Sequence, residues 1–232
     1  MSTARRPRIA IVVFPGSNDD RDAALALEGL GAEASLVWHA EGRLPDVEAV
    51  ILPGGFSYGD YLRCGAIARF APVMQAVGAF AEDGGLVLGI CNGFQVLCEA
   101  GLLPGTLRPN ASLEFVCRDV ELQLERADTP FTSRAEPGRS LTIPIKHGEG
   151  CFFADDELLA ELERNGQVVL RYAQNPNGSV AGIAGVVNER GNVFGLMPHP
   201  EHAVDPLLGS TDGALVLGSL VDAARERLLT AA

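Results

Sequence analysis

The sequence predicts an α/β fold: a doubly wound, mostly parallel sheet flanked by helices, with a β-rich antiparallel extension. Two observations lead to this prediction. In the first hundred residues, short apolar strands alternate with amphipathic helices, which is the order that produces parallel βαβ units. From about Leu107 to Val187 the pattern changes to β-rich segments separated by turn sequences such as EPGR and NPNG.

Each expected element has a local signal. The strands are near-continuous apolar runs, as in a sheet that helices cover on both faces. The first helix begins with acidic residues and ends before a glycine at position 31. In chain order we expect strands at 8–14, 34–38, 49–52, 85–90 and 193–197, and helices at 19–30, 72–81, 92–100 and 213–229. The elements are expected to form a single domain over residues 1–232.

Composition excludes several classes of function. The net charge is −12 and Lys146 is the only lysine, which argues against a nucleic-acid-binding surface. The apolar run after the N-terminal arginines is too short for a signal peptide, and no later run approaches the ~18 apolar residues of a spanning helix. Five irregularly spaced cysteines argue against a disulfide framework and for a reducing cytoplasm. No zinc-binding spacing, P-loop or dinucleotide motif is present, so we expect no metal and no cofactor in this chain.

Cys91 lies where an apolar strand gives way to a helical pattern, in the stretch GLVLGICNGFQVLCEAGLLPG. Gly89 and Gly93, two residues before and after it, permit a sharp strand-to-helix turn like that of the nucleophile elbow. A helix start favours thiolate over thiol, and a nearby imidazole would lower the cysteine pKa further. A lone cysteine in such a frame is more often a packed small hydrophobe, so the assignment as nucleophile depends on a partner base.

His199, in the sequence MPHPE, is the candidate base. Prolines on both sides bias this segment toward extended backbone, in which side chains at i and i+2 share a face, so that Glu201 can reach the imidazole. Cys91, His199 and Glu201 would then act as nucleophile, acid/base and orienting carboxylate, each on a loop that follows a strand of the sheet. On its own, HPE could equally be a solvated turn.

The stretch ILPGGFSYGD could supply an oxyanion hole. Gly54 and Gly55 follow a strand and leave their backbone amides unobstructed, so one of these N–H groups and that of Asn92 could converge on a developing oxyanion. The alternative is a plain turn. The glycine-rich sequence KHGEG around His147 has no assigned purpose at this point.

GICNGFQ, with PGGFSYGD before it and MPHPE after it, resembles the class I (triad) glutamine amidotransferases. Further segments are typical, more narrowly, of the glutaminase subunits of phosphoribosylformylglycinamidine synthases in purine biosynthesis; they are FPGSN, GDYLRCGAIA, LLPGTLRPNASLEFVCR, IKHGEG and NPNGS. The resemblance spans nearly the whole chain and implies a flavodoxin-like amidotransferase fold.

The resemblance also implies roles for individual residues: Cys91 as nucleophile, His199 and Glu201 as the rest of the triad, Gly55 and Asn92 as oxyanion amides, and Gln95 beside the bound glutamine. It implies hydrolysis of glutamine to glutamate and ammonia through a cysteine thioester. Ammonia would pass to an ATP-dependent synthetase subunit, usually with a small bridging subunit, and ATP and Mg are expected on that synthetase. The chain departs from the family pattern in two places, where Asp19 replaces a common cysteine and His202 a common arginine, and neither residue is given a role.

Three alternatives remain open at this point. The triad fits equally a glutaminase that serves histidine, pyridoxal phosphate or GMP synthesis, and only the narrower segments favour purine synthesis. A non-catalytic redox sensor or chaperone with an elbow cysteine would need no pair of histidine and carboxylate. A cysteine variant of an α/β-hydrolase would place its acid before its histidine, whereas here the acid follows.

Overall fold

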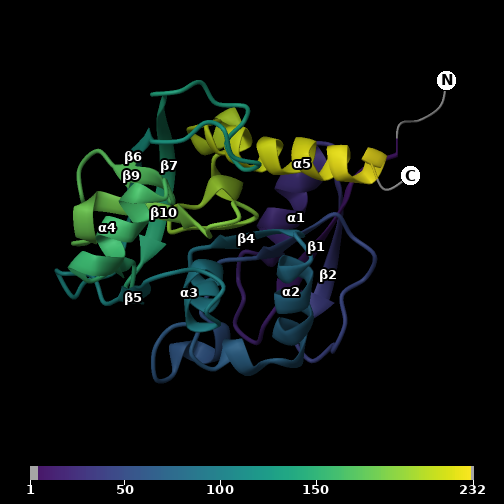
Figure 1. The fold of residues 1–232 in the computed structure, drawn as a ribbon, viewed down its shortest axis with the longest axis horizontal. Helices are drawn as coiled ribbons and strands as arrows, with labels where there is room; N and C mark the ends of the chain where they lie inside the picture. The colour runs from purple at the N-terminus through teal and green to yellow at the C-terminus, as the bar shows by residue number, and fades with distance from the viewer. Residues whose placement is uncertain (1–4, 231–232) are drawn as a thin grey trace.

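One nine-stranded sheet runs through the protein in the computed structural model, which describes residues 5–230 (Figure 1). The strand order is β2-β1-β3-β4-β11-β10-β9-β6-β7, and β5 and β8 form a separate antiparallel pair. The strands are β1 (Arg8–Val13), β2 (Glu33–Trp38), β3 (Ala49–Leu52), β4 (Leu86–Ile90), β5 (Thr106–Arg108), β6 (Val116–Leu124), β7 (Ser140–His147), β8 (Cys151–Phe153), β9 (Val168–Tyr172), β10 (Ile183–Val187) and β11 (Val193–Leu196). The helices are α1 (Asp20–Gly29), α2 (Pro72–Glu82), α3 (Asn92–Glu99), α4 (Asp156–Arg164) and α5 (Gly213–Thr230), with short 3-10 turns η1 (Ser57–Asp60), η2 (Ala68–Phe70), η3 (Val180–Gly182), η4 (Pro200–His202) and η5 (Pro206–Leu208).

The parallel half of the sheet, from β2 to β11, is doubly wound. Helices α1 and α5 pack against each other on one face, and α2 and α3 cover the other face (Figure 1). Every residue of β3 and β4 is buried, which explains why these strands read as unbroken apolar runs. The predicted α/β fold class is confirmed, and the predicted elements of this half lie within about two residues of the observed ones.

The antiparallel half continues the same sheet. Strand β10 pairs antiparallel with β11 and with β9, and β6 joins β9 to β7. Helix α4 lies within this half, where the sequence pattern predicts only β-rich segments. Its signals are local: the Asp155 side chain accepts a hydrogen bond from the Leu158 N–H at 2.9 Å as an N-cap, and Leu162 is buried on the packed face.

Loops at the carboxyl edge of the parallel strands position the site. Neighbouring strands β4 and β11 run in register, with Gly89 opposite Gly195 and Ile90 opposite Leu196. The residues that follow both strands therefore leave the sheet at the same level, next to the loops that follow β1 and β3.

No helix within residues 5–230 is both long enough and apolar enough to span a membrane.

Candidate active site

Cys91 sits on the sharp turn between β4 and α3. Its backbone has φ 49° and ψ −103°, a conformation that non-glycine residues adopt at a cost of ~1–3 kcal/mol and that is concentrated at functional sites. A Cβ on Gly93 would overlap the Leu52 carbonyl oxygen, and one on Gly89 would lie 2.8 Å from the Gly93 carbonyl carbon. Both glycines are therefore required by close backbone packing, and the turn has the elbow geometry that the sequence predicts.

His199 and Glu201 form a buried pair, called here the His–Glu pair. Nδ1 of His199 lies 2.6 Å from Oε1 of Glu201, and the two side chains are 0% exposed. The His199 N–H donates to the Pro144 carbonyl at 2.8 Å, which anchors this loop to β7. Nε2 of His199 is buried and has no hydrogen-bond partner among residues 5–230, so it is the ring atom left to exchange a proton with a reacting group.

Burial sets the protonation of the His–Glu pair. It lowers the pKa of His199 to about 3 and raises the pKa of Glu201 to about 8. At neutral pH the pair therefore holds two protons, one between Nδ1 and Oε1, which are 2.6 Å apart, and one on Nε2. Once the Nε2 proton leaves, Nδ1–H donates to the carboxylate and the Nε2 lone pair is free to act as a base.

The thiol of Cys91 is protonated in the free protein. Burial raises its pKa far above the ordinary value, and the Asp19 and Glu201 carboxylates raise it further, against the opposing effects of the Lys146 ammonium and the Asn92 backbone N–H. The expectation of a lowered cysteine pKa is therefore wrong for this structure, because the helix start is outweighed by burial. Attack by Cys91 requires a base to remove the thiol proton as the reaction proceeds.

Asp19 and Lys146 lie against the His–Glu pair. Lys146 Nζ is 2.5 Å from Asp19 Oδ1, and Asp19 Oδ2 is 3.6 Å from His199 Nδ1. A Cβ on Gly54 would overlap Asp19 Oδ2 and lie 2.7 Å from Cε1 of His199. Glycine at position 54 thus lets the loop after β3 approach the histidine. The Asp19–Lys146 contact spans 127 residues of sequence and has no local signal.

His202 stacks on His199, with ring centroids 5.3 Å apart and an interplanar angle of 10°. Asp19, His199, Glu201 and His202 together resemble a set of metal ligands. Lone pairs of imidazole nitrogens lie in the ring planes, and two stacked, nearly parallel planes cannot both contain one ion. Nδ1 of His199 and Oδ1 of Asp19 are also already engaged by Glu201 and Lys146. These residues do not fit a metal centre.

The proposed oxyanion loop is tightly packed. Gly55 has φ 137°, and a Cβ there would lie 2.6 Å from the Asn18 nitrogen and 2.7 Å from the Gly16 carbonyl oxygen. The Asn92 side chain accepts a hydrogen bond from the Ser57 N–H at 3.1 Å, which joins this loop to the elbow. Packing alone thus demands glycine at position 55, and the role of the Gly55 and Asn92 amides in holding an oxyanion stays a prediction.

Cys91 opens on a cavity of about 180 Å³ that Gln95 also lines. The Gln95 side chain accepts from Asn92 Nδ2 at 2.8 Å and donates to the Glu149 carbonyl at 2.6 Å, so it holds the KHGEG loop against α3. A neighbouring cavity of about 50 Å³ reaches His199. Four residues line both cavities: Gly55, Phe56, Phe115 and Lys146. The cavity therefore lies between the elbow, the glycine loop and the KHGEG loop.

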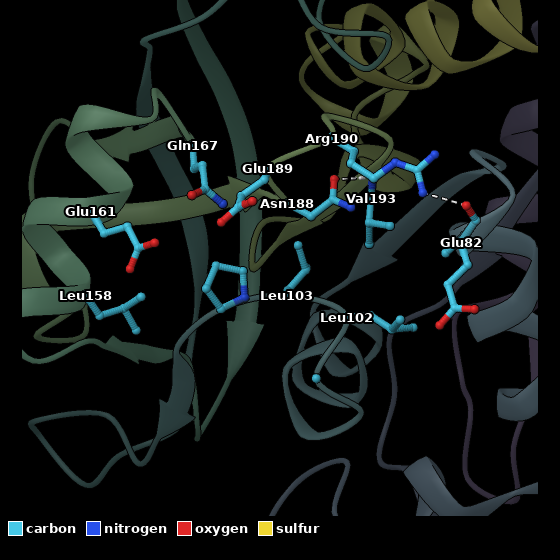
Figure 2. Close-up of a pocket in the computed structure, with 13 residues that line it drawn as sticks. Glu82, Leu102, Leu103, Leu158, Glu161, Gln167, Asn188, Glu189, Arg190 and Val193 are labelled. Carbon is cyan, nitrogen blue, oxygen red and sulfur yellow. Dashed lines mark hydrogen bonds between the residues drawn. The ribbon is translucent and has the colours of Figure 1, made fainter.

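A larger hollow, of about 530 Å³, lies at the opposite end of the strands (Figure 2). It separates α4 of the antiparallel half from the ends of α2 and α3, with Glu82, Leu102, Glu161 and Val193 among its walls. Neither a cysteine nor a histidine lines it, so the chemistry belongs to the smaller cavity beside Cys91.

Comparison with known proteins agrees with this geometry. Residues 6–211 match the model of the CobB/CobQ-like glutamine amidotransferase domain. The chain is 60% identical over 225 residues to the phosphoribosylformylglycinamidine synthase subunit PurQ of Salinibacter ruber, covering 93% of this chain and 96% of the relative. It is 61% identical over 218 residues to the protein of the same name from Rubrobacter xylanophilus, covering 94% and 99%. The chain belongs to the PurQ family of glutamine amidotransferases.

Solved structures place this amidotransferase in the same group. A chain in the structure of PurLQS from Thermotoga maritima is 50% identical, with a TM-score of 0.88 over 94% of this chain and 99% of that chain. Another glutamine amidotransferase from Thermotoga maritima has a TM-score of 0.61 over 97% of this chain and 99% of that chain, but only 18% identity, so it shares the fold alone. The PurQ-family amidotransferase is therefore an enzyme, which excludes the non-catalytic sensor.

Proposed function

We propose that this amidotransferase is the glutaminase subunit of phosphoribosylformylglycinamidine synthase in purine biosynthesis. The observation that carries the proposal is the juxtaposition of Cys91, on a strained turn after β4, with the buried His–Glu pair after the neighbouring strand β11. The identity of 55–61% to PurQ proteins from four bacteria supports this pathway over histidine, pyridoxal phosphate or GMP synthesis.

The chemistry follows from the placement of these groups. As the Cys91 sulfur attacks the side-chain amide carbon of glutamine, Nε2 of His199 takes the thiol proton and Glu201 stabilises the resulting imidazolium. Backbone amides at Gly55 and Asn92 hold the oxyanion. His199 then gives its proton to the departing ammonia, which leaves a γ-glutamyl thioester, and water activated by the same imidazole hydrolyses the thioester to glutamate.

In this proposal ammonia passes to an ATP-dependent synthetase subunit, in a cytoplasmic complex that includes a small bridging subunit. ATP and Mg bind to the synthetase, and this chain needs no cofactor. The name of the PurLQS structure is consistent with such an assembly in the relative. Phe56 and Phe115 line the cavity and are exposed, which suits a partner that covers the cavity and receives ammonia. Three more exposed apolar side chains lie within two residues of cavity-lining positions in the sequence; they are Tyr61, Leu62 and Leu113.

The test is reconstitution with the candidate synthetase, measuring formylglycinamidine ribonucleotide made from glutamine and from ammonium salts. Cys91→Ala should abolish synthesis from glutamine and leave synthesis from ammonium unchanged, while circular dichroism and binding to the synthetase stay as in the wild type. Glutamine hydrolysis by the isolated chain should be slow and should rise about 5- to 150-fold in the complex, the usual scale of coupling between sites. Glutamine-dependent synthesis by the Cys91→Ala complex would contradict the proposal.

A further inference from the structure

A hollow of about 450 Å³ reaches Glu201 from the side of helix α1. Among the described residues it shares no lining residue with the cavity beside Cys91 or with the smaller cavity that reaches His199. The His–Glu pair is therefore approached from two sides, by the cavities through His199 and by this hollow through Glu201. We call it the α1–η4 hollow; the lining residues used below are Asp22, Leu25, Glu201, His202, Asp205 and Leu208.

The α1–η4 hollow is acidic and contains no basic partner for its carboxylates. Within residues 5–230 neither a lysine nor an arginine pairs with Asp22, Glu201 or Asp205. Asp22 lies 3.2 Å from Nε2 of His202, and the Asp205 side chain accepts a hydrogen bond from the Leu207 N–H at 2.9 Å. Oε2 of Glu201 is buried and has no hydrogen-bond partner among the same residues. Three carboxylates around one hollow favour a cationic occupant.

Exposed leucines surround the hollow and indicate what kind of cation it receives. Leu25 is 67% exposed and Leu208 is 59% exposed, and both line the hollow. Leu207, the neighbouring residue of η5, is 93% exposed. A small cation would leave most of this apolar surface in water, whereas a protein segment can cover it. The occupant that fits is a protein segment with a lysine or arginine beside apolar side chains.

A positive charge in the hollow acts on the protonation of the His–Glu pair. When the Nε2 proton leaves, the pair becomes negative, because His199 is then neutral and Glu201 is ionised. His202 lines the hollow and stacks on His199, and its positive charge lowers the pKa of Glu201. A cation held on the same side acts in the same direction and stabilises the ionised carboxylate.

The other charged groups around the His–Glu pair leave this requirement unmet. Asp19, 3.6 Å from Nδ1 of the pair, raises the pKa of its carboxyl, and Lys146, which lowers that pKa, is 2.5 Å from Asp19. Asp22, on the far side of His202, raises the pKa of the imidazole. The thiol of Cys91 is protonated and adds no charge. Burial remains the largest influence and raises the pKa of the carboxyl to about 8.

We propose that the α1–η4 hollow receives a lysine or arginine side chain of the synthetase, and that this cation stabilises the Glu201 carboxylate in the complex. The proposal rests on the proposed function, in which the synthetase is the partner that uses the ammonia. The isolated amidotransferase then holds the pair mostly protonated at neutral pH, and docking frees the Nε2 lone pair of His199. The hollow links assembly to the strength of the base without a change in the cavity beside Cys91.

A lysine placed in the wall of the hollow tests the effect of charge in the isolated full chain. Leu25 lies three residues after Asp22 on α1, so a lysine at this position can pair with Asp22 beside the hollow. In Leu25→Lys the acidic limb of kcat/KM for glutamine hydrolysis should move about 0.3 to 1 pH unit lower, which raises activity below the limb about 2- to 10-fold. Leu25→Gln, which is neutral, is the matched control and should leave the limb in place.

The same variants test the docking of the partner's cation. Leu25→Lys should bind the synthetase about 3- to 10-fold more weakly than Leu25→Gln at low salt, because its lysine occupies the place of the partner's cation, and the difference should shrink at high salt. Asp205→Asn keeps the acceptor for the Leu207 N–H but removes a charge, so it should also weaken binding. Asp119→Asn, the same change on an exposed residue of β6, should not.

Labelling with a maleimide locates the contact. The thiol of Leu208→Cys should be labelled readily in the isolated chain and slowly once the synthetase is bound. Leu229→Cys, at an exposed position of α5, is the control and should be labelled at the same rate in both states.

Three results would overturn the inference: an unmoved acidic limb in Leu25→Lys, equal affinity of Leu25→Lys and Leu25→Gln for the synthetase, or labelling of Leu208→Cys that the synthetase does not slow. Any of these with a wild-type complex that makes product from glutamine would overturn the cation site alone. A wild-type complex that fails to hydrolyse glutamine would overturn the proposed function as well.

Discussion

Replacing Glu201 by Gln removes the charge that supports the imidazolium while keeping a side chain of the same shape. The Glu201 oxygen is 2.6 Å from Nδ1 of His199. At a separation of ~4 Å between centres of charge and an effective dielectric constant of ~20, such a pair interacts by ~4 kcal/mol. Since each ~1.36 kcal/mol is tenfold in rate, full loss would lower kcat ~10³-fold. Asp19, whose Oδ2 is 3.6 Å from Nδ1, supplies part of the missing charge. We therefore expect a fall of ~10²–10³, smaller than for Cys91→Ala or His199→Ala.

The assay is steady-state glutamine hydrolysis in the reconstituted complex, with kcat and KM determined separately. KM should change little, because Glu201 acts on the charge that develops during reaction rather than on bound glutamine. Glu136→Gln, an exposed residue outside the site, is the control for loss of one carboxylate. An unchanged kcat in Glu201→Gln would show that Glu201 has no catalytic role and that the HPE segment is only a turn. The mechanism would then depend on Cys91 and His199 alone.

Three further predictions test the geometry. Gly93→Ala should cost ~1–3 kcal/mol in the free energy of unfolding, measured by urea denaturation, because the new methyl overlaps a β3 carbonyl; Gly78→Ala in α2, with open space around it and no positive φ, should lack that cost. Because burial raises the pKa of the carboxyl in the His–Glu pair to about 8, kcat/KM should rise with pH as the Nε2 proton leaves, with an acidic limb near 8; a limb near the ordinary carboxyl value would contradict this. Asp19→Asn should speed iodoacetamide labelling of Cys91 about 3- to 10-fold at fixed pH, because the carboxylate raises the thiol pKa, whereas the exposed Asp22→Asn should change it less than about twofold.

Periodicity and turn chemistry are enough to predict the parallel half. An apolar run such as Ala49–Leu52 can be buried on both faces only in a covered sheet, and glycines two residues before and after Cys91 are a local signal of a tight turn between strand and helix. The pairing of His199 with Glu201 is predictable for the same local reason, because extended backbone between prolines puts both on one face. Each of these patterns involves only a few neighbouring residues, so it can be recognised in the sequence without knowledge of tertiary contacts.

Contacts between distant segments cannot be predicted in this way. Asp19 and Lys146 meet across 127 residues, and Asp60 and Glu149 share a cavity only because the η1 loop and the β7 loop converge over α3. The KHGEG sequence is conspicuous for its glycines, but nothing local shows that its histidine faces Asn110 and its glutamate the cavity. Helix α4 is not predicted because most of the long segment around it has the sequence patterns of strands and turns.

The protonation of Cys91 shows how the same limit changes a mechanism. A helix start and a nearby imidazole favour thiolate, and both are local features. Depth of burial and the carboxylates of Asp19 and Glu201 act in the opposite direction, and they are properties of the assembled fold. A neutral thiol beside a His–Glu pair is a weak nucleophile until a substrate amide carbon is in place and proton transfer to Nε2 of His199 accompanies attack. The thiolate and the imidazolium then form only when substrate is bound. In a site built this way the free protein holds no reactive thiolate, and glutamine hydrolysis begins only when the cavity is occupied.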